Sequence, residues 1–257
     1  MITAGCDVGS LTAKAVILDE KRVVGRAVAK SLANPGESAR MVMGKALEGT
    51  GLGMDALDGI VGTGYGREKI DFVHAVQSEI ACHASGARHL VPSVHTVIDI
   101  GGQDCKAIRL EPDGAVARFV TNDKCAAGTG RFLEVMAQVL DLPLDQLGRL
   151  GRRGRKPVTL ASTCTVWAQA DVIRFVNDRF PVEDIAAGIC MAMAQRMAVL
   201  ANSLGLVKDL CMTGGVAKAL EEQLGLRIRP IRKMDPQLAG ALGAALLARE
   251  TKRSGSG

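Results

Sequence analysis

The chain contains an internal repeat, in which DVGSLTAKAVIL at residues 7–18 and DIGGQDCKAIRL at residues 99–110 align without a gap. The two segments share five identical residues in twelve positions. Each copy has the pattern of a buried strand that ends in an acidic residue and a glycine, a tight polar turn, and a second strand. Because the copies are about 92 residues apart, the repeat predicts two related domains and not a short-period solenoid. The alternative is two unrelated hairpins that share a D-x-G turn.

Strand-like runs alternate with helix-like runs along the chain, which favours the α/β class. The composition, 47% hydrophobic and 23% charged residues, is ordinary for a globular protein and excludes a disordered chain. Apolar periodicity predicts helices over 38–49, with Ser38 as the N-cap, and over 73–86. The repeat favours a first domain over 1–95 and a second over 96–237, and residues 251–257 read as a tail.

No targeting or membrane segment is expected. The longest apolar stretch, 186–194, is far shorter than the ~20 residues that cross a bilayer, and the start lacks the features of a signal peptide. The seven cysteines are an odd, widely spread set, so we expect reduced thiols and a cytoplasmic protein. Two basic runs, at 149–156 and 227–233, are interpreted first of all as solvated loops. A docking surface for an acidic partner protein is the second interpretation, and a nucleic-acid surface is the third.

The repeated turns have the chemistry of a metal–phosphate site. A glycine after the strand lets phosphate oxygens approach backbone N–H groups, and Asp7 and Asp99 could hold Mg²⁺ directly or through its waters. The segment MTGGV at 212–216 also follows a predicted strand, and its glycines would let a purine or ribose lie against the backbone. A plain hairpin turn and a plain strand-to-helix turn are the alternatives. No G-x-x-x-x-G-K-[ST] phosphate loop is present.

Two of the cysteines, Cys125 and Cys164, each come just before a predicted helix. A helix start offers free N–H groups and a positive dipole, which stabilise a thiolate or an anionic cluster. The residues alone leave the choice open, because a cysteine is often a small buried apolar residue. No C-x-x-C spacing occurs in the chain.

Taken together, these motifs resemble those of the superfamily of actin, sugar kinases and heat-shock chaperone ATPases, with ribonuclease H-like domains. Within it, the chain resembles the BadF/BadG/BcrA/BcrD-type iron–sulfur ATPases, which activate 2-hydroxyacyl-CoA dehydratases or serve benzoyl-CoA reductases. The resemblance covers nearly the whole chain in family order. The segments that carry it are DVGSLTAKAVIL (7–18), GTGYGRE (62–68), VIDIGGQDCKAI (97–108), NDKCAAGTGRFLEVMA (122–137), STCTVWAQADVI (162–173), MTGGVA (212–217) and GALGAA (240–245).

The resemblance implies a two-domain actin-like fold with ATP and Mg²⁺ in the cleft between the domains. In that fold a helix near 238–250 would pack back on the first domain. It assigns the first phosphate loop to Asp7, Gly9, Ser10, Thr12 and Lys14. It assigns the second to Asp99, Gly101, Gly102, Gln103 and Asp104, and the adenosine contacts to Gly214, Gly215 and Val216. Phosphoryl transfer needs positioning and charge neutralisation, so Asp7 and Asp99 serve as metal ligands and either Gln103 or Asp104 orients the attacking water.

The resemblance also implies that Cys125 and Cys164 are iron ligands. Because two thiolates cannot complete the four ligands of a 4Fe–4S cluster, two copies of the chain would share one cluster in an oxygen-sensitive homodimer. The implied activity is ATP-driven one-electron transfer from a donor such as ferredoxin or flavodoxin to a 2-hydroxyacyl-CoA dehydratase. The alternatives are a benzoyl-CoA reductase-like or other low-potential partner, a metabolite kinase of the same fold, and a non-redox regulatory ATPase. Nucleic acid and membrane are not expected partners.

Overall fold

The computed structural model describes residues 1–122, 126–161, 164–205, 209–212, 221, 224–225 and 227–254. The chain divides into two compact units. The first comprises residues 1–97, 110–117 and 231–257, and the second comprises residues 98–109 and 118–230. The two repeated turns are therefore distributed one to each unit, with Asp7 in the first and Asp99 in the second.

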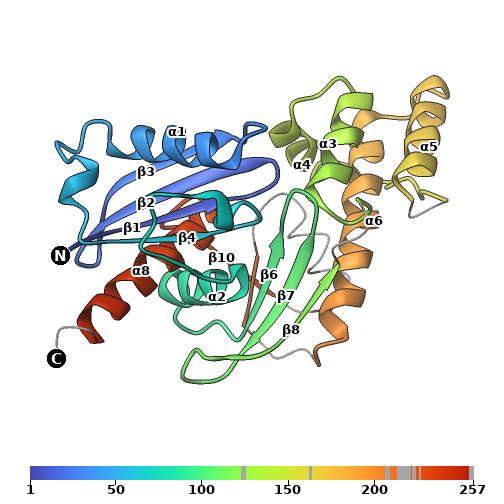
Figure 1. Ribbon diagram of the computed structural model, residues 1–257. Coiled ribbons are helices and arrows are strands. Elements are labelled where there is room, and N and C mark those ends of the chain that lie inside the picture. Colours follow the sequence, from blue (N-terminus) through green and yellow to red (C-terminus); the bar gives the residue numbers. More distant parts are fainter. Residues whose placement is uncertain are drawn as a thin grey trace. The chain divides into compact units, whose positions relative to one another are not determined.

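A five-stranded sheet forms the centre of the first unit (Figure 1). Its strand order is β3-β2-β1-β4-β5; β1 pairs antiparallel with β2 and parallel with β4. The central strands β1 and β4 are almost completely buried, as expected for strands that helices cover on both faces. The strands are β1 (Ile2–Val8), β2 (Thr12–Asp19), β3 (Arg22–Lys30), β4 (Gly59–Thr63) and β5 (Ala75–Val76).

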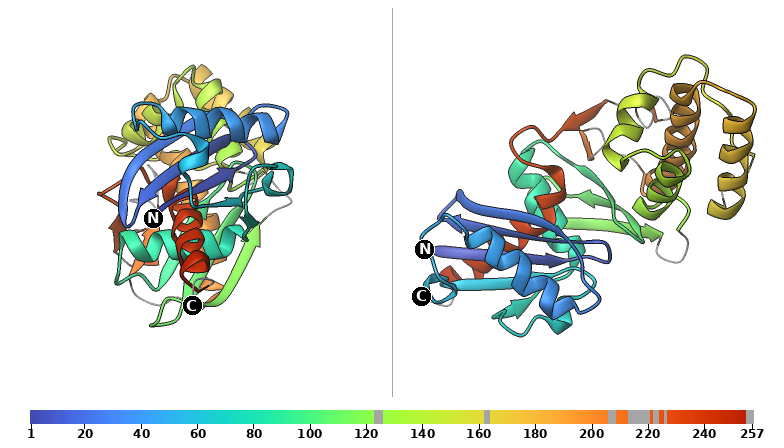
Figure 2. Two further views of the ribbon diagram at one scale, coloured as in Figure 1. Left: turned by 60° about the vertical axis from the view of Figure 1, so that its left-hand side comes forward. Right: turned by 90° about the horizontal axis from the view of Figure 1, so that it is seen from above.

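Helices cover the two faces of this sheet (Figures 1 and 2). Helix α1 (Pro35–Leu47) packs on β1, β2 and β3. Helix α8 (Ala239–Ser254) packs on β1, β2 and β4 from the other face. Helix α2 (Glu79–Leu90) packs on α8. Strand β1 alternates with a period of two, so Ala4, Cys6 and Val8 join the core beneath α1. The residues between them, Thr3, Gly5 and Asp7, therefore face α8.

Small residues bring α8 unusually close to its neighbours. A Cβ added at Gly5 of β1 would lie 2.0 Å from the carbonyl oxygen of Ala241, and one at Gly86 of α2 would lie 1.9 Å from that of Ala239. A Cβ at Gly243 of α8 would lie 1.8 Å from the carbonyl oxygen of Cys82. The GALGAA segment therefore contributes backbone-to-backbone packing, which only residues without a side chain permit.

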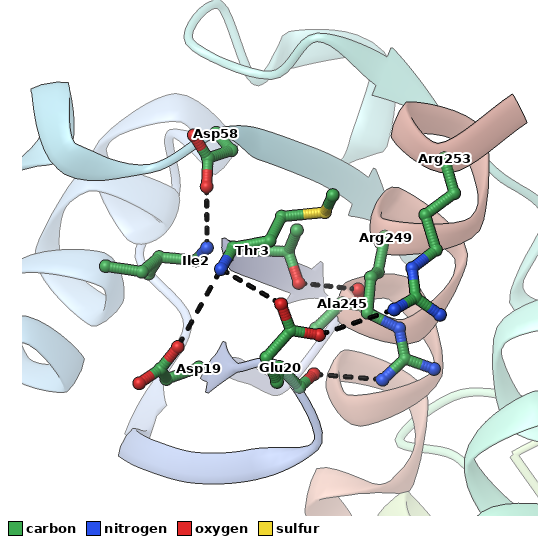
Figure 3. Close-up of polar contacts among 9 residues, drawn as sticks. Ile2, Thr3, Asp19, Glu20, Asp58, Ala245, Arg249 and Arg253 are labelled. Atoms are coloured by element: carbon green, nitrogen blue, oxygen red, sulfur yellow. Dashed lines mark hydrogen bonds and ion pairs between the residues drawn. The ribbon is translucent and has the colours of Figure 1, made fainter. Parts of the chain in front are cut away.

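Polar contacts fix the other end of α8 to the same sheet (Figure 3). The Thr3 hydroxyl donates to the carbonyl oxygen of Ala245 at 3.0 Å, and Arg249 Nη1 donates to the carbonyl oxygen of Glu20 at 2.9 Å. The Glu20 carboxylate in turn accepts from the Met1 amino group at 3.2 Å. These contacts join α8 to β1 and to the turn between β2 and β3.

The second sheet has the order β10-β9-β6-β7-β8. Its strands are β6 (Thr96–Ile100), β7 (Cys105–Leu110), β8 (Val116–Asn122), β9 (Leu210–Met212) and β10 (Ile228–Pro230). The helices of the second unit that the structure describes pack with this sheet around one apolar core. They are α3 (Gly130–Val139), α4 (Leu144–Gly151), α5 (Thr165–Asn177) and α6 (Val182–Asn202). Three short 3₁₀ turns lie in the first unit: η1 (Met54–Ala56), η2 (Arg67–Lys69) and η3 (Pro236–Leu238).

Helix α6 is, within the described ranges, the one helix long and apolar enough to cross a membrane by length and composition. However, 61% of its apolar window is buried inside the fold, where it forms the centre of the second core. A buried core helix and a membrane span satisfy the same test, so this property alone is weak evidence for a membrane segment.

Candidate nucleotide and cysteine sites

The first repeated turn joins β1 to β2. Asp7 and Lys14 are directly opposed in the antiparallel register, and Lys14 Nζ lies 3.2 Å from Asp7 Oδ2. The turn between them is closed by the Gly9 N–H, which donates to the carbonyl oxygen of Thr12 at 3.0 Å. Asp7 is only 3% exposed, so the ammonium group compensates a nearly buried carboxylate. Ser10, at the tip of the turn, is half-buried.

The second repeated turn joins β6 to β7 and has the same ion pair. Lys106 Nζ lies 3.5 Å from Asp99 Oδ2 and 2.6 Å from Asp104 Oδ2, and the Lys106 side chain is 5% exposed. The Asp104 carboxylate also folds over Gly101, where an added Cβ would lie 2.1 Å from Asp104 Oδ1. Gln103, by contrast, is exposed at the tip of the turn. Asp104 thus has a structural partner on each side, and the Gln103 side chain faces solvent.

The second turn is hydrogen-bonded directly to the start of α3. The Gly130 N–H donates to the carbonyl oxygen of Gly101 at 2.8 Å, and the Arg131 N–H donates to that of Gly102 at 2.9 Å. A Cβ at Gly130 would approach the Gly101 oxygen to 2.9 Å, so a side chain there would strain this contact. The segment that precedes α3 begins after Cys125, which lies outside the described residues. Sequence reasoning missed this connection, because residues 101 and 130 share no pattern.

Two glycines lie against the Asp7 carboxylate in the first unit. Gly64, in the loop after β4, has φ +93°, and an added Cβ would lie 2.6 Å from Asp7 Oδ1. At Gly240, near the start of α8, an added Cβ would lie 3.0 Å from Asp7 Oδ2 and 2.9 Å from His83 Nε2. The GTGYGRE and GALGAA segments are thus placed beside the first turn, and His83 of α2 is a polar neighbour of the same carboxylate.

Five of the six cysteines that the structure describes are buried. Burial is the main cause that raises the pKa of each thiol, so these side chains stay protonated at neutral pH. They are Cys6, Cys82 and Cys211, each with a pKa of about 12, Cys190, with a pKa of about 11, and Cys105, whose pKa is also raised. Protonated, inaccessible thiols are poor metal ligands.

Cys164 differs from these five, because it is exposed at the N-cap position of α5. The next residue, Thr165, has a buried hydroxyl without a hydrogen-bond partner in the described part of the chain. Val166 and Trp167 follow in the first turn and are 71% and 67% exposed. Nowhere in the described ranges do three or more His, Cys, Asp or Glu side chains gather as a metal site.

The expected adenosine loop lies almost wholly outside the residues that the structure describes. Strand β9 ends at Met212, and Gly214, Gly215 and Val216 lie outside the described residues.

The basic run at 149–156 is not wholly a loop: Arg149 belongs to the last turn of α4 and forms an ion pair with Asp145. In the segment after α4, Arg153 lies 3.8 Å from Glu183, so part of this charge is compensated within the unit.

Comparison with known proteins shows which family the chain belongs to. Residues 4–248 match the model of the BadF/BadG/BcrA/BcrD ATPase family. The chain belongs to this family. An activator of lactoyl-CoA dehydratase from Anaerotignum propionicum is 43% identical over 254 residues, which cover 97% of this chain and 98% of the relative.

Two solved structures of family members are similar over their whole length. Component A of the Acidaminococcus fermentans (R)-2-hydroxyglutaryl-CoA dehydratase matches with a TM-score of 0.93 and 41% identity, covering 98% of this chain and 99% of that one. The activator of the 2-hydroxyisocaproyl-CoA dehydratase from Clostridium difficile, solved with bound ADPNP, matches with a TM-score of 0.94 and 37% identity over 100% and 97%.

The expected α/β class and two-domain actin-like ATPase fold are thereby confirmed. A ROK family glucokinase from Streptomyces griseus shares this fold with a TM-score of 0.58 but only 14% identity, so that likeness concerns the fold alone. The protein is an ATPase of the BadF/BadG/BcrA/BcrD family.

Proposed function

We propose that this ATPase couples ATP hydrolysis to one-electron transfer into a partner iron–sulfur enzyme, a dehydratase that acts on a 2-hydroxyacyl-CoA. The observation that carries the proposal is the pair of hydrogen bonds from Gly130 and Arg131 to the second repeated turn. They join the expected phosphate-binding turn to the segment that follows Cys125. The relatives named as activators of 2-hydroxyacyl-CoA dehydratases support the class of partner.

The two repeated turns would bind the phosphates of ATP and its Mg²⁺. Both turns offer backbone N–H groups next to a carboxylate, and a hard oxygen donor suits Mg²⁺. Because Lys14 and Lys106 already neutralise Asp7 and Asp99, the carboxylates fit a metal held through its own waters better than one bound directly. The two lysines also place positive charge where phosphate oxygens are expected.

Gln103, and not Asp104, would orient the attacking water. The Asp104 carboxylate forms an ion pair with the Lys106 ammonium group and lies over Gly101. These contacts fix its orientation within the turn, so it is not directed at a water molecule. The exposed Gln103 amide can accept and donate hydrogen bonds without breaking an ion pair. Water orientation by a glutamine is sufficient for hydrolysis, because phosphoryl transfer requires no covalent nucleophile.

Cys125 and Cys164 would hold a 4Fe–4S cluster that two copies of the chain share, and such a cluster supplies electrons one at a time. The described residues fit this assignment: Cys164 is exposed at a helix start, while the five other described cysteines are buried and protonated. The buried Thr165 hydroxyl, which has no hydrogen-bond partner among the described residues, offers a hydrogen bond beside it. A shared cluster requires a homodimer, and we propose with it an electron donor such as ferredoxin or flavodoxin and a cytoplasmic location.

The coupling would run through the second unit. A change at Gly101 and Gly102 on loss of the γ-phosphate would move the Gly130 and Arg131 amides, and with them the start of α3. ATP and ADP can favour different arrangements of that segment only if they contact the turn differently.

The test uses the anaerobically purified protein, a chemical reductant, a purified 2-hydroxyacyl-CoA dehydratase and its substrate. We expect enoyl-CoA formation with ATP, and none with ADPNP or with the Cys164→Ser variant. The Cys190→Ser variant is the matched control and should retain activity. Equal dehydration with ATP and ADPNP would contradict the proposal, and phosphorylation of a small metabolite would favour the kinase alternative.

A further inference from the structure

The imidazole of His83 lies beside the Asp7 carboxylate, on the face of β1 that α8 covers. His83 Nε2 and Asp7 Oδ2 are 2.9 Å and 3.0 Å from the point that a Cβ of residue 240 would occupy. Since residue 240 is glycine, this space between the imidazole and the carboxylate is not filled by a side chain. His83 is half-buried, and it lies outside every segment that carries the family resemblance.

The backbone contacts of α2 and α8 fix this position. Cys82, immediately before His83, has its carbonyl oxygen against Gly243, and Gly86, one turn later, lies against Ala239. These contacts leave no room for α2 to slide or rotate on α8. The position of the imidazole relative to Asp7 is therefore set by helix packing and not by a flexible loop.

We propose that His83 is a positioning residue for the first phosphate turn, where it holds Asp7 and a metal-bound water in the orientation that Mg²⁺–nucleotide binding requires. Asp7 Oδ2 already accepts a hydrogen bond from Lys14 Nζ, and the close backbone of Gly64 restricts Asp7 Oδ1. The imidazole Nε2 and Asp7 Oδ2 lie on either side of the space beside Gly240. This proposal rests on the proposed function, because it places Mg²⁺ at Asp7.

Other charged groups lie near the neighbouring Cys82. Glu79 lies one turn before His83 on α2, and both Glu79 and Arg67 act electrostatically on the neighbouring Cys82 thiol. Arg67 itself forms an ion pair with Glu68 at 3.2 Å. His83 is the imidazole that reaches the space beside Gly240, whereas His89, at the last turn of the same helix, is exposed.

The test measures Mn²⁺ binding to the ADP-bound protein by electron paramagnetic resonance, together with kcat and KM of the ATPase. In the His83→Ala variant, the Mn²⁺ concentration for half-saturation should rise about tenfold, the range expected when an outer-sphere partner of a metal ligand is lost. The melting temperature and the KM for ATP at saturating Mg²⁺ should stay unchanged. His83→Gln, which keeps a hydrogen-bonding group, should restore most of the affinity, and His89→Gln should match the parent.

Two outcomes would overturn the proposal: half-saturation within twofold of the parent in His83→Ala, or no rescue in His83→Gln after a loss in His83→Ala. Asp7→Asn separates this proposal from the proposed function. If Asp7→Asn weakens Mn²⁺ binding and His83→Ala does not, the metal site stands and the role of His83 is wrong. If neither change has an effect, the placement of the metal at Asp7 is wrong.

Discussion

The second repeated turn makes a sharp prediction, because its two candidate water-orienting residues differ in their surroundings. Lys106 is almost completely buried and lies 2.6 Å from Asp104 Oδ2. Breaking a buried ion pair by removing one partner costs about 3–5 kcal/mol. Asp99 remains as a second partner of Lys106, and Asp104 is 28% exposed, so Asp104→Asn should cost about 2–3 kcal/mol, at or below the low end of that range. Gln103 is exposed, so Gln103→Ala should change stability by less than about 0.5 kcal/mol.

The effects on catalysis should be the reverse. Gln103→Ala should lower kcat for ATP hydrolysis by about 10²-fold with little change in KM, the size expected for the loss of one positioned hydrogen-bonding group. Asp104→Asn should keep kcat within about tenfold of the parent once the protein is folded. Urea unfolding gives the change in the free energy of unfolding for each variant, and steady-state ATPase assays give the change in kcat for each. A stable but inactive Asp104→Asn protein beside an active Gln103→Ala protein would refute the assignment.

Three further predictions concern charge, packing and coupling. Asp99→Asn should reduce ATP hydrolysis by at least ~10²-fold with normal iron content, and a parental rate would show that the second turn does not bind the metal. Gly5→Ala should destabilise the first unit by about 3 kcal/mol or more, because its Cβ would meet a backbone oxygen, whereas Gly44→Ala, with nothing within 4 Å, should be neutral or stabilising in urea unfolding. Iron should be removed by a chelator at different rates in the ATP and ADP states, and in Gly130→Ala the two rates should converge; equal rates in the parent would contradict the coupling.

The repeat was enough to predict the two hairpins, because an acidic residue and a lysine seven positions later are brought opposite each other by a short antiparallel turn. The sequence did not indicate which glycines pack against the backbone of another element. Gly5 and Gly86 look ordinary in the sequence, and their contacts with α8 depend on how segments over 150 residues apart come together. The same holds for His83, which is beside Asp7 only because α2 packs on α8.

Local signals near helix starts produced the errors. The predicted helix at 38–49 begins at Pro35 instead, because the Asn34 side chain accepts from the Gly36 N–H at 2.9 Å and caps it. The predicted helix at 73–86 begins at Glu79, since Ala75 and Val76 pair with β4. In both places a capping contact or a strand pairing sets the first residue of the helix. Apolar periodicity alone does not mark that residue, because the apolar pattern continues across the helix boundary.

The central claim, a redox role for the two cysteines, is tested most directly by anaerobic iron analysis. Each chain would offer Cys125 and Cys164 to a shared cluster, so iron should approach about four atoms per dimer, the content of one 4Fe–4S cluster. Cys125→Ser and Cys164→Ser should each abolish iron binding and leave ATP binding intact, whereas Cys190→Ser should retain full iron because that thiol is buried with a pKa of about 11. Full iron in Cys125→Ser or Cys164→Ser, or a monomer with a complete cluster, would contradict the account.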